Sequence, residues 1–231
     1  MIIETMTKNG GIKMIKKCCW LTTIVLLTII LMVGNIIVLA QEEQEESNTV
    51  YINAEHLEYE DEKTILSGKI NIKKNETVIQ AARGELFREE NRMELEEEIN
   101  VDYPDGNVKA KRMSALLDAE EYVFENSVVL KYLLEEEEEN DMVLNSDYLK
   151  IFGDNNSFNA KNNVVIDYDN KIFKGDNADY NGDEEILYLT GNVLIEEGED
   201  WVKSDEAKFF LGSDEKGYTA DGNVEIKINL D

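Results

Sequence analysis

The sequence predicts an all-β protein, an antiparallel meander of about a dozen strands arranged in six repeats of about 29 residues. Three observations support this prediction. A strand with the same apolar pattern returns at nearly constant spacing, apolar and polar residues alternate within each such strand, and turn-forming residues separate the strands. Together they favour a stack of similar units, each of which buries its apolar face against its neighbours.

The repeat is visible in strands that the chain enters through Gly, Asn or Glu. The first apolar residues of these strands are Ile70, Ile99, Val128, Val164, Val193 and Val224. Successive differences between these positions are 29, 29, 36, 29 and 31 residues. The longest interval contains the acidic run Glu135 to Asp141, whose seven residues account for the excess, so we expect a loop inserted between regular units.

Within the repeat, apolar and polar residues alternate with the period of a β-strand. The segments Ile70 to Lys73 and Val224 to Leu230 both alternate, which gives each strand one apolar and one polar face. Asn, Asp and Gly separate the strands, as in residues 180–184, because these residues tolerate the positive φ of tight hairpins. The stretch Met113 to Phe124 resembles a short helix locally, but its place in the repeat predicts strands.

The N-terminal 40 residues have the composition of an export signal. Lys13, Lys16 and Lys17 precede a 14-residue apolar run, Trp20 to Val33, and small residues lead up to Ala40. The stretch is also long enough to remain in the membrane as a single-pass anchor, so a signal peptide and an N-terminal membrane anchor are both open. Either one would export the rest of the chain, which divides into an acidic linker at residues 41–48 and a β-repeat domain at residues 49–231.

The charge and the scarce residue types exclude several classes of function. The chain has 50 acidic and 23 basic residues and a net charge of -27, so it offers no basic surface for nucleic acid. Its single histidine, His56, lies in a variable position of the repeat and is expected on the surface. Cys18 and Cys19 both fall in the leader, which leaves the domain without a thiolate metal site or a cysteine nucleophile. Glu135 to Glu139 lack the interposed Gly and Asp of a calcium loop, and no acid stands out from the repeat as a catalytic pair would. We therefore expect no enzymatic activity, no cofactor and no metal.

Two segments of the repeat, Ala54 to Ile70 and Ala178 to Val193, resemble the OstA-like domain of lipopolysaccharide-transport proteins. The resemblance covers about residues 50 to 230. It implies an elongated, twisted antiparallel β-jellyroll in the periplasm, whose interior shields the acyl chains of lipopolysaccharide on the way to the outer membrane. It also implies two partners, an inner-membrane ABC export complex and an outer-membrane assembly protein, joined by edge-strand addition. Residues 82–86 are more similar to the membrane-anchored member of this system, which hands lipid to the soluble bridge, so both roles are open.

A slot for acyl chains would be lined by the apolar faces of the repeated strands. An acyl chain of about a dozen carbons meets a barrier of roughly 10 kcal/mol on entering water, and a continuous apolar slot removes most of it without chemistry. The sequence contains no Gly-rich phosphate-binding loop, so the driving energy must come from a partner. The candidate lipid-binding residues are Ile70, Ile72, Ile99, Val101, Val128, Leu130, Val164, Ile166, Val193, Ile195, Val224 and Ile226.

The ends of the predicted meander lack partner strands. The first strand, Thr49 to Ala54, and the last, Val224 to Leu230, would have unpaired edges that invite strand addition, including a head-to-tail homo-oligomer. An acidic β-repeat surface protein without a lipid ligand is the alternative function, because the same apolar faces could serve only as a packed core.

Overall fold

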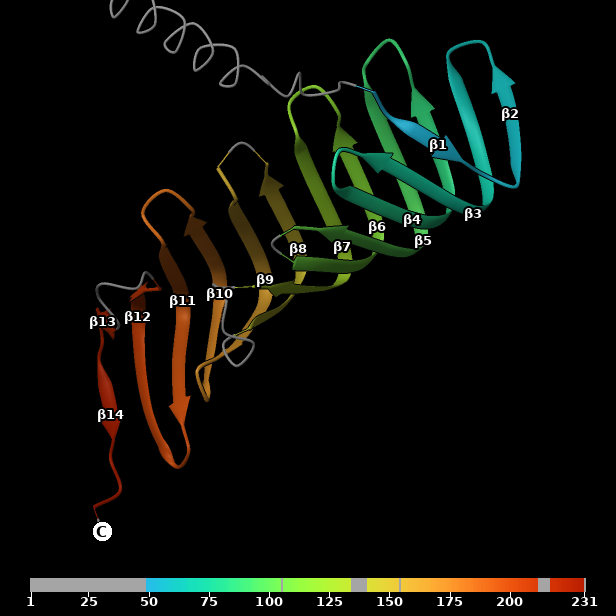
Figure 1. Cartoon of the computed structure of the whole chain (residues 1–231). Coiled ribbons are helices and arrows are strands. Elements are labelled where there is room, and N and C mark those ends of the chain that lie inside the picture. Colours follow the sequence, from blue (N-terminus) through green and yellow to red (C-terminus); the bar gives the residue numbers. More distant parts are fainter. Residues whose placement is uncertain (1–48, 105, 134–140, 154, 212–216, 231) are drawn as a thin grey trace, which may run out of the picture. The chain divides into compact units, whose positions relative to one another are not determined.

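The computed structural model describes residues 49–104, 106–133, 141–153, 155–211 and 217–230, which form one antiparallel sheet (Figure 1). The prediction of an all-β, antiparallel fold is confirmed. The strands are β1 (Tyr51–Asn53), β2 (His56–Glu60), β3 (Lys63–Lys74), β4 (Thr77–Phe87), β5 (Arg92–Tyr103), β6 (Gly106–Leu116), β7 (Glu121–Tyr132), β8 (Met142–Phe152), β9 (Ser157–Tyr168), β10 (Lys171–Asn181), β11 (Ile186–Glu197), β12 (Asp200–Phe210), β13 (Gly217–Asp221) and β14 (Glu225–Lys227).

From β3 to β12 the sheet is a simple meander in which each strand pairs with its neighbours in the chain. Each edge of the sheet is filled by two short strands in place of one long strand. At the N-terminal edge, β2 and β1 pair with the two halves of β3. At the C-terminal edge, β13 and β14 pair with the two halves of β12. The outward sides of these four short strands pair with no other strand of the described residues, so the sheet is open at both ends.

Each long strand has a shift of register near its middle, which it shares with its neighbours. On the odd-numbered strands the shift falls at residues of positive φ, among them Gly68 at 75°, Asn126 at 68°, Asn162 at 63° and Gly191 at 77°. Bulges of this kind bend a strand and increase its twist. We call the line that joins them across the sheet the crease.

The crease corrects one interpretation of the sequence. Gly68 and Gly191, which the repeat suggests as entry points of strands, lie instead in the interior of β3 and β11. The hydrogen-bonded ladders of β3 with β4 and of β11 with β12 resume beyond these glycines, because the positive φ creates a bend and not a strand end. The expected last strand, Val224 to Leu230, is also shorter than predicted, since β14 covers only Glu225–Lys227.

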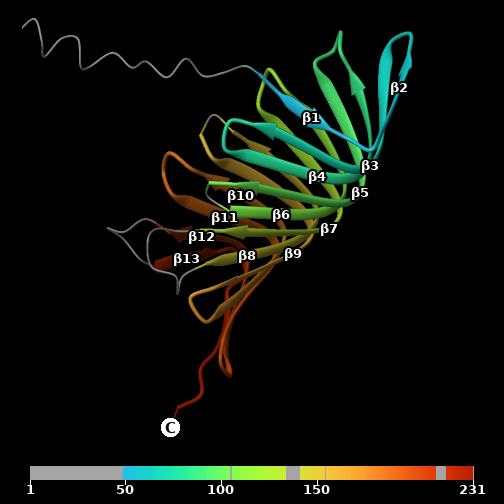
Figure 2. The ribbon, with the colours of Figure 1, turned by 45° about the vertical axis from the view of Figure 1, so that its right-hand side comes forward.

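The crease folds the sheet into two facing layers (Figure 2). Phe173 on β10 contacts Phe209 on β12, with ring centroids 4.4 Å apart, although β11 lies between these two strands. Strands two positions apart in one layer are separated by about 10 Å, so the rings meet across the gap between layers. Layer A consists of β2, β13 and the half of each long strand that belongs to the same run of paired strands as β2 and β13. Layer B consists of β1, β14 and the other half of each long strand.

The core lies between the two layers. Interior positions alternate along each half-strand, as in β3, where Thr64 and Leu66 face inward from layer A and Ile70 and Ile72 from layer B. Met113 to Phe124, the possible helix, belongs to β6, a turn and β7, as the repeat predicts. Within the described residues no helix is long and apolar enough to cross a membrane. The leader at residues 1–40, the linker at 41–48 and Glu135 to Glu139 lie outside them.

Candidate functional site

The candidate lipid-binding residues lie in two neighbouring rows on the inner face of layer B. Ten of the twelve are at most 4% exposed and face layer A from β3, β5, β7, β9 and β11. The other two, Val224 and Ile226, lie at the C-terminal edge and are 43% and 60% exposed. The interior is therefore filled by side chains from β3 to β11, and its apolar surface reaches solvent at β14.

Layer A contributes an equal share of the interior, which the candidate residues do not include. It presents Leu66, Leu95, Phe124, Ala160 and Leu189, all buried. Each of these residues precedes the first candidate residue of its strand by four positions, as Leu66 precedes Ile70. An even spacing keeps both residues on the inner face of the sheet. The alternation in the sequence therefore also predicts the inner positions of layer A, which come before the crease in these strands.

The two layers are displaced relative to each other along the sheet. At the end of β3 in layer B, the Nζ of Lys74 lies 2.6 Å from Oε1 of Glu120, which directly precedes β7 in layer A. At the end of β7 in layer B, Tyr132 contacts Tyr180 of β10, with ring centroids 5.7 Å apart. In both places a layer B half-strand faces a layer A half-strand three or four positions further along the chain, as the accumulated twist of the sheet requires.

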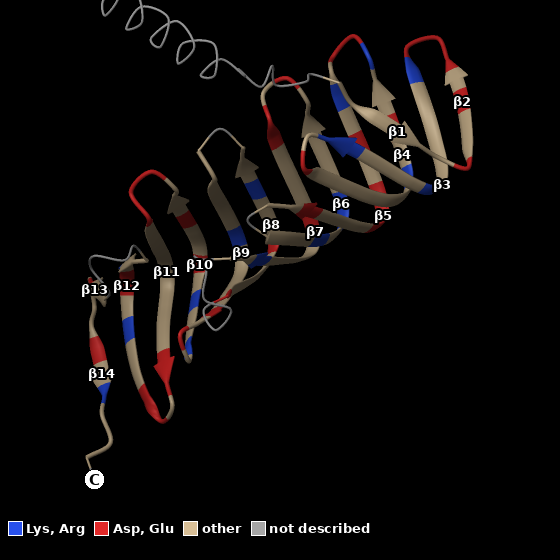
Figure 3. Cartoon of the chain, in the orientation of Figure 1, with Lys and Arg blue, Asp and Glu red and all other residues tan. Residues whose placement is uncertain are grey.

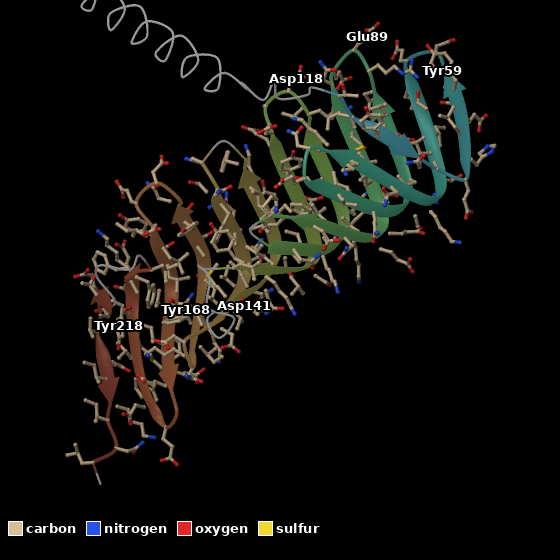
Figure 4. The ribbon with its side chains drawn as sticks, in the orientation of Figure 1. Tyr59, Glu89, Asp118, Asp141, Tyr168 and Tyr218 are labelled. Carbon is tan, nitrogen blue, oxygen red and sulfur yellow. The ribbon has the colours of Figure 1, made fainter. Side chains whose placement is uncertain are left out.

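This displacement leaves the inner face uncovered at opposite ends of the two layers. At the N-terminal end it is layer A that is bare, and Leu57 and Tyr59 of β2 are exposed although they pair with the buried Leu66 and Thr64. At the C-terminal end it is layer B, where the exposed Ile226 pairs with Val202. Tyr59 and Tyr218 mark the two ends of layer A (Figure 4).

The long side opposite the crease, where the hairpin turns of the two layers approach each other, contains a cavity of about 240 Å³. We call this long side the mouth. The floor of the cavity includes Val101, Val108, Phe124 and Ile151. The Lys74–Glu120 ion pair lies at its rim, and the Nζ of Lys74 also donates to the carbonyl oxygen of Leu117 at 3.1 Å. The sequence does not predict this cavity, because only the layer displacement brings β3 beside the turn before β7.

Two tyrosines at the mouth have shifted ionisation. Burial raises the pKa of Tyr122, with Lys74 acting in the opposite direction and Glu120 in the same direction. Burial likewise raises the pKa of Tyr168, a residue that lines a smaller cavity with Phe209 and Tyr218. The tyrosine hydroxyls therefore stay neutral in the ordinary range of pH.

Charged residues occur along the strands and at the turns of the described chain (Figure 3). Apart from the phenol of Tyr180, the buried polar residues of the described chain are Thr64, Ser146 and Ser204, so no carboxylate, ammonium or guanidinium group is among them. On the outer face, Arg112 pairs with Glu96 at 2.6 Å, and a hydrogen bond from this guanidinium to Glu96 raises the pKa of Arg112. Exposed pairs of this kind contribute little to stability. His56 is exposed on β2, and no cluster of potential metal ligands occurs among the described residues.

The sequence of this chain matches a known protein family. Residues 51–215 match the family described as "LptA/(LptD N-terminal domain) LPS transport protein". Among solved structures, the chain is similar to LptH from Pseudomonas aeruginosa, described as the LptA homologous periplasmic component of the lipopolysaccharide transport device. The two are 8% identical, the match covers 80% of this chain and 99% of that chain, and the TM-score is 0.32. No curated protein matches the sequence.

Proposed function

The chain belongs to the LptA/LptD N-terminal domain family of LPS transport proteins, and we propose that it is a non-enzymatic periplasmic carrier or bridge that shields lipopolysaccharide acyl chains. The observation that carries this proposal is the apolar interior between two layers, which is uncovered at both ends of the sheet. A shield for hydrocarbon must be continuous, and a domain with both ends uncovered can continue into a partner at either end.

The free-energy cost of exposing acyl chains to water favours such a shield. Each buried CH₂ contributes about 0.8 kcal/mol, so a chain of about a dozen carbons gains roughly 10 kcal/mol by staying out of water. The interior of β3 to β11 is packed with the protein's own side chains, so lipid must enter by parting the two layers. Among the described residues, the layers are covalently joined through the crease of each long strand and through the links between β1 and β2 and between β13 and β14. Contacts such as Tyr132–Tyr180 hold the mouth closed. Parting them would exchange side-chain contacts for contacts with acyl chains.

The lipid proposal is tested by site-specific photocrosslinking. A photoreactive residue at Ile195, which is buried in layer B, should crosslink to lipopolysaccharide, whereas the same residue at Lys203 on the outer face should not. Equal labelling at both positions, or no labelling at Ile195 in the folded protein, would refute an interior path. Consistent absence of lipid in native mass spectra would favour an acidic surface protein without a lipid ligand.

We also propose that copies of the domain, or related partners, join end to end by edge-strand addition. Layer A is bare at the N-terminal end and layer B at the C-terminal end, so each could cover the other across a joint between copies. The direction also fits, because β2 runs antiparallel to β3 and β13 runs antiparallel to β12, so β13 of one copy would lie antiparallel to β2 of the next.

The inner rows of the sheet define the register of this joint. Thr64 pairs with Tyr59 and Leu86, and Phe209 pairs with Leu187 and Tyr218 in the equivalent row. A second copy that continues the same rows would place its Tyr59 opposite Tyr218 and its Ile52 opposite Ile226. The aromatic and aliphatic side chains that are exposed in one copy would thereby be covered.

Cysteine crosslinking tests this register, because the domain has no native cysteine. Thr219→Cys combined with Glu58→Cys places both thiols on the outer face at directly opposite positions, within disulfide reach. We expect a ladder of covalent oligomers on oxidation. Thr219→Cys with Glu60→Cys is the control, since its thiols are displaced by roughly 7 Å along the strand. Equal crosslinking in the two variants would contradict the register, and unchanged association after deletion of Val224 to Asp231 would contradict the joint.

A further inference from the structure

The cavity at the mouth joins an apolar floor to one pair of opposite charges. Of the described residues that line it, Lys74 and Glu120 are the only charged ones, and they come from different layers. A dry apolar cavity of roughly 150 Å³ can hold benzene, so about 240 Å³ has room for several carbons of a hydrocarbon chain. The site thus offers one end that suits alkyl carbons and one end that suits an ion.

The two charged groups differ in how strongly they depend on each other. The side chain of Lys74 is only 13% exposed, whereas that of Glu120 is 42% exposed. A largely buried ammonium needs a counter-ion, because removing its partner leaves an uncompensated charge in a poorly solvated place. A half-exposed carboxylate can return to water at small cost. Glu120 is therefore the partner that another anion could replace.

The backbone conformation of Glu120 also supports the view that Glu120 is the replaceable partner of Lys74. Its φ is 51°, in the left-handed region, and the equivalent turn positions in the neighbouring hairpins are held by Asn91 at 47° and Asn156 at 53°. Asparagine tolerates this region well, whereas other non-glycine residues rarely adopt it. Glu185 occupies the equivalent position of another hairpin, with a φ of 53°, and takes part in no ion pair among the described residues. Local conformation therefore does not favour a glutamate at residue 120.

We propose that this cavity binds a single-chain anionic amphiphile, with the phosphate or carboxylate head replacing Glu120 at Lys74 and the first carbons of the chain on the apolar floor. The proposal deepens the proposed function and rests on it for the class of ligand. It names a place at the side of the domain where the anionic end of a lipid would be held. The hydrogen bond from Nζ of Lys74 to the carbonyl oxygen of Leu117 does not depend on Glu120, so it would hold the ammonium in position during the exchange.

The neighbouring groups are compatible with this exchange. Tyr122 lines the same cavity and is neutral, so it adds no charge that would oppose an anion. Acidic residues at the layer A turns would repel the anionic head of a ligand through long-range electrostatics. One of them is Asp118, two residues before Glu120 (Figure 4). At 0.15 M salt the screening length is about 8 Å, which limits that repulsion to close neighbours.

Calorimetric titration of the full chain with decyl phosphate at 0.15 M salt tests the proposal. Lys74→Met keeps the aliphatic stem but removes the charge, and we expect it to weaken binding at least tenfold. Lys73→Met is the matched control, because this adjacent lysine faces outward and is exposed, and it should stay within twofold of wild type. Glu120→Asn removes the competing carboxylate and suits the left-handed backbone, so it should tighten binding several-fold.

The opposite signs of the two changes separate ligand binding from a structural role. If Lys74–Glu120 served only to hold the layers together, Glu120→Asn would weaken binding as Lys74→Met does, and the proposal would be wrong. Equal losses in Lys74→Met and Lys73→Met, or binding of inorganic phosphate as tight as that of decyl phosphate, would also overturn it. Thermal unfolding of each variant identifies any that fail to fold, in which case Glu120→Asn alone decides.

The outcome is distinguishable from failure of the proposed function. Interior crosslinking of lipopolysaccharide at Ile195, measured in Lys74→Met, should persist, because Ile195 on β11 is remote in the sheet from β3. If decyl phosphate does not bind while interior crosslinking persists, only the mouth site is refuted. If interior crosslinking is absent while decyl phosphate binding depends on Lys74, only the carrier function is refuted.

Discussion

Asn192 donates a hydrogen bond through Nδ2 to Oδ2 of Asp176 at 2.8 Å, which connects the crease of β11 to that of β10. The same type of hydrogen bond recurs at two other places along the crease, from Asn163 to Asp147 at 2.6 Å and from Asn223 to Asp205 at 2.9 Å. Asn192 and Asn163 lie on the bends of β11 and β9, whereas Asn223 lies in the link between β13 and β14. Each amide faces a carboxylate on the bend of the preceding long strand. The contacts are exposed, so each contributes modestly, but together they fix the line along which the sheet folds.

The crease glycine next to this contact should be sensitive to substitution. Gly191 has a φ of 77°, and a Cβ added there would lie 2.5 Å from Oδ2 of Asp176. Gly198 has a φ of 62° with nothing within 4 Å of the added atom, which makes it a matched control. Gly198→Ala should cost about 1 kcal/mol from backbone conformation alone. Gly191→Ala should cost about 1 to 3 kcal/mol more, because the acid must also move. Urea unfolding measures both, and equal losses would show that the crease accommodates a side chain freely.

The contact between layers should dominate the stability of the C-terminal half. Phe173 and Phe209 pack edge to face across the layers, and both are buried. Phe173→Ala should lower the free energy of unfolding by about 3 to 5 kcal/mol, since it removes a large buried ring and leaves a cavity. Leu116→Ala, at an exposed position of β6, should change it by less than about 1 kcal/mol. A small loss in Phe173→Ala would mean that the two layers do not depend on this contact.

The sequence predicts much of this architecture because alternation is a local property. The inner positions of layer B, such as Ile70 and Ile72, follow from period two alone. The crease does not follow, because Gly68 and Gly191 have the local pattern of a turn, and only hydrogen bonds to β4 and β12 on both sides of the bends show that β3 and β11 continue through it. The mouth cavity cannot be predicted from the sequence, since Lys74 and Glu120 meet only because the twist of the sheet displaces the two layers.

Burial separates two isoleucines that the sequence treats as equivalent. Ile195 is buried in layer B, so Ile195→Asp would place a carboxylate in the apolar interior and should unfold the domain or destabilise it by several kcal/mol. Ile226 is exposed on β14, so Ile226→Asp should leave the unfolding free energy within about 1 kcal/mol of wild type. The same change should reduce end-to-end association, because it places a charge in the proposed joint. Circular dichroism and analytical ultracentrifugation measure the two effects, and a folded Ile226→Asp variant that associates normally would contradict the joint.

Alkaline pH should weaken the closure of the mouth through Tyr122. Burial raises the pKa of this phenol above its usual value of 10.0, so the folded state binds the proton more tightly than the unfolded state. The stabilisation is complete below about pH 10 and is lost as the pH rises through the folded-state pKa, since the unfolded chain ionises first. Unfolding free energies measured between pH 9 and pH 11 should therefore fall more steeply in wild type than in Tyr122→Phe, which has no proton to lose. If wild type and Tyr122→Phe show the same slope, the phenol at the mouth is solvated in the folded state and does not contribute to closing it.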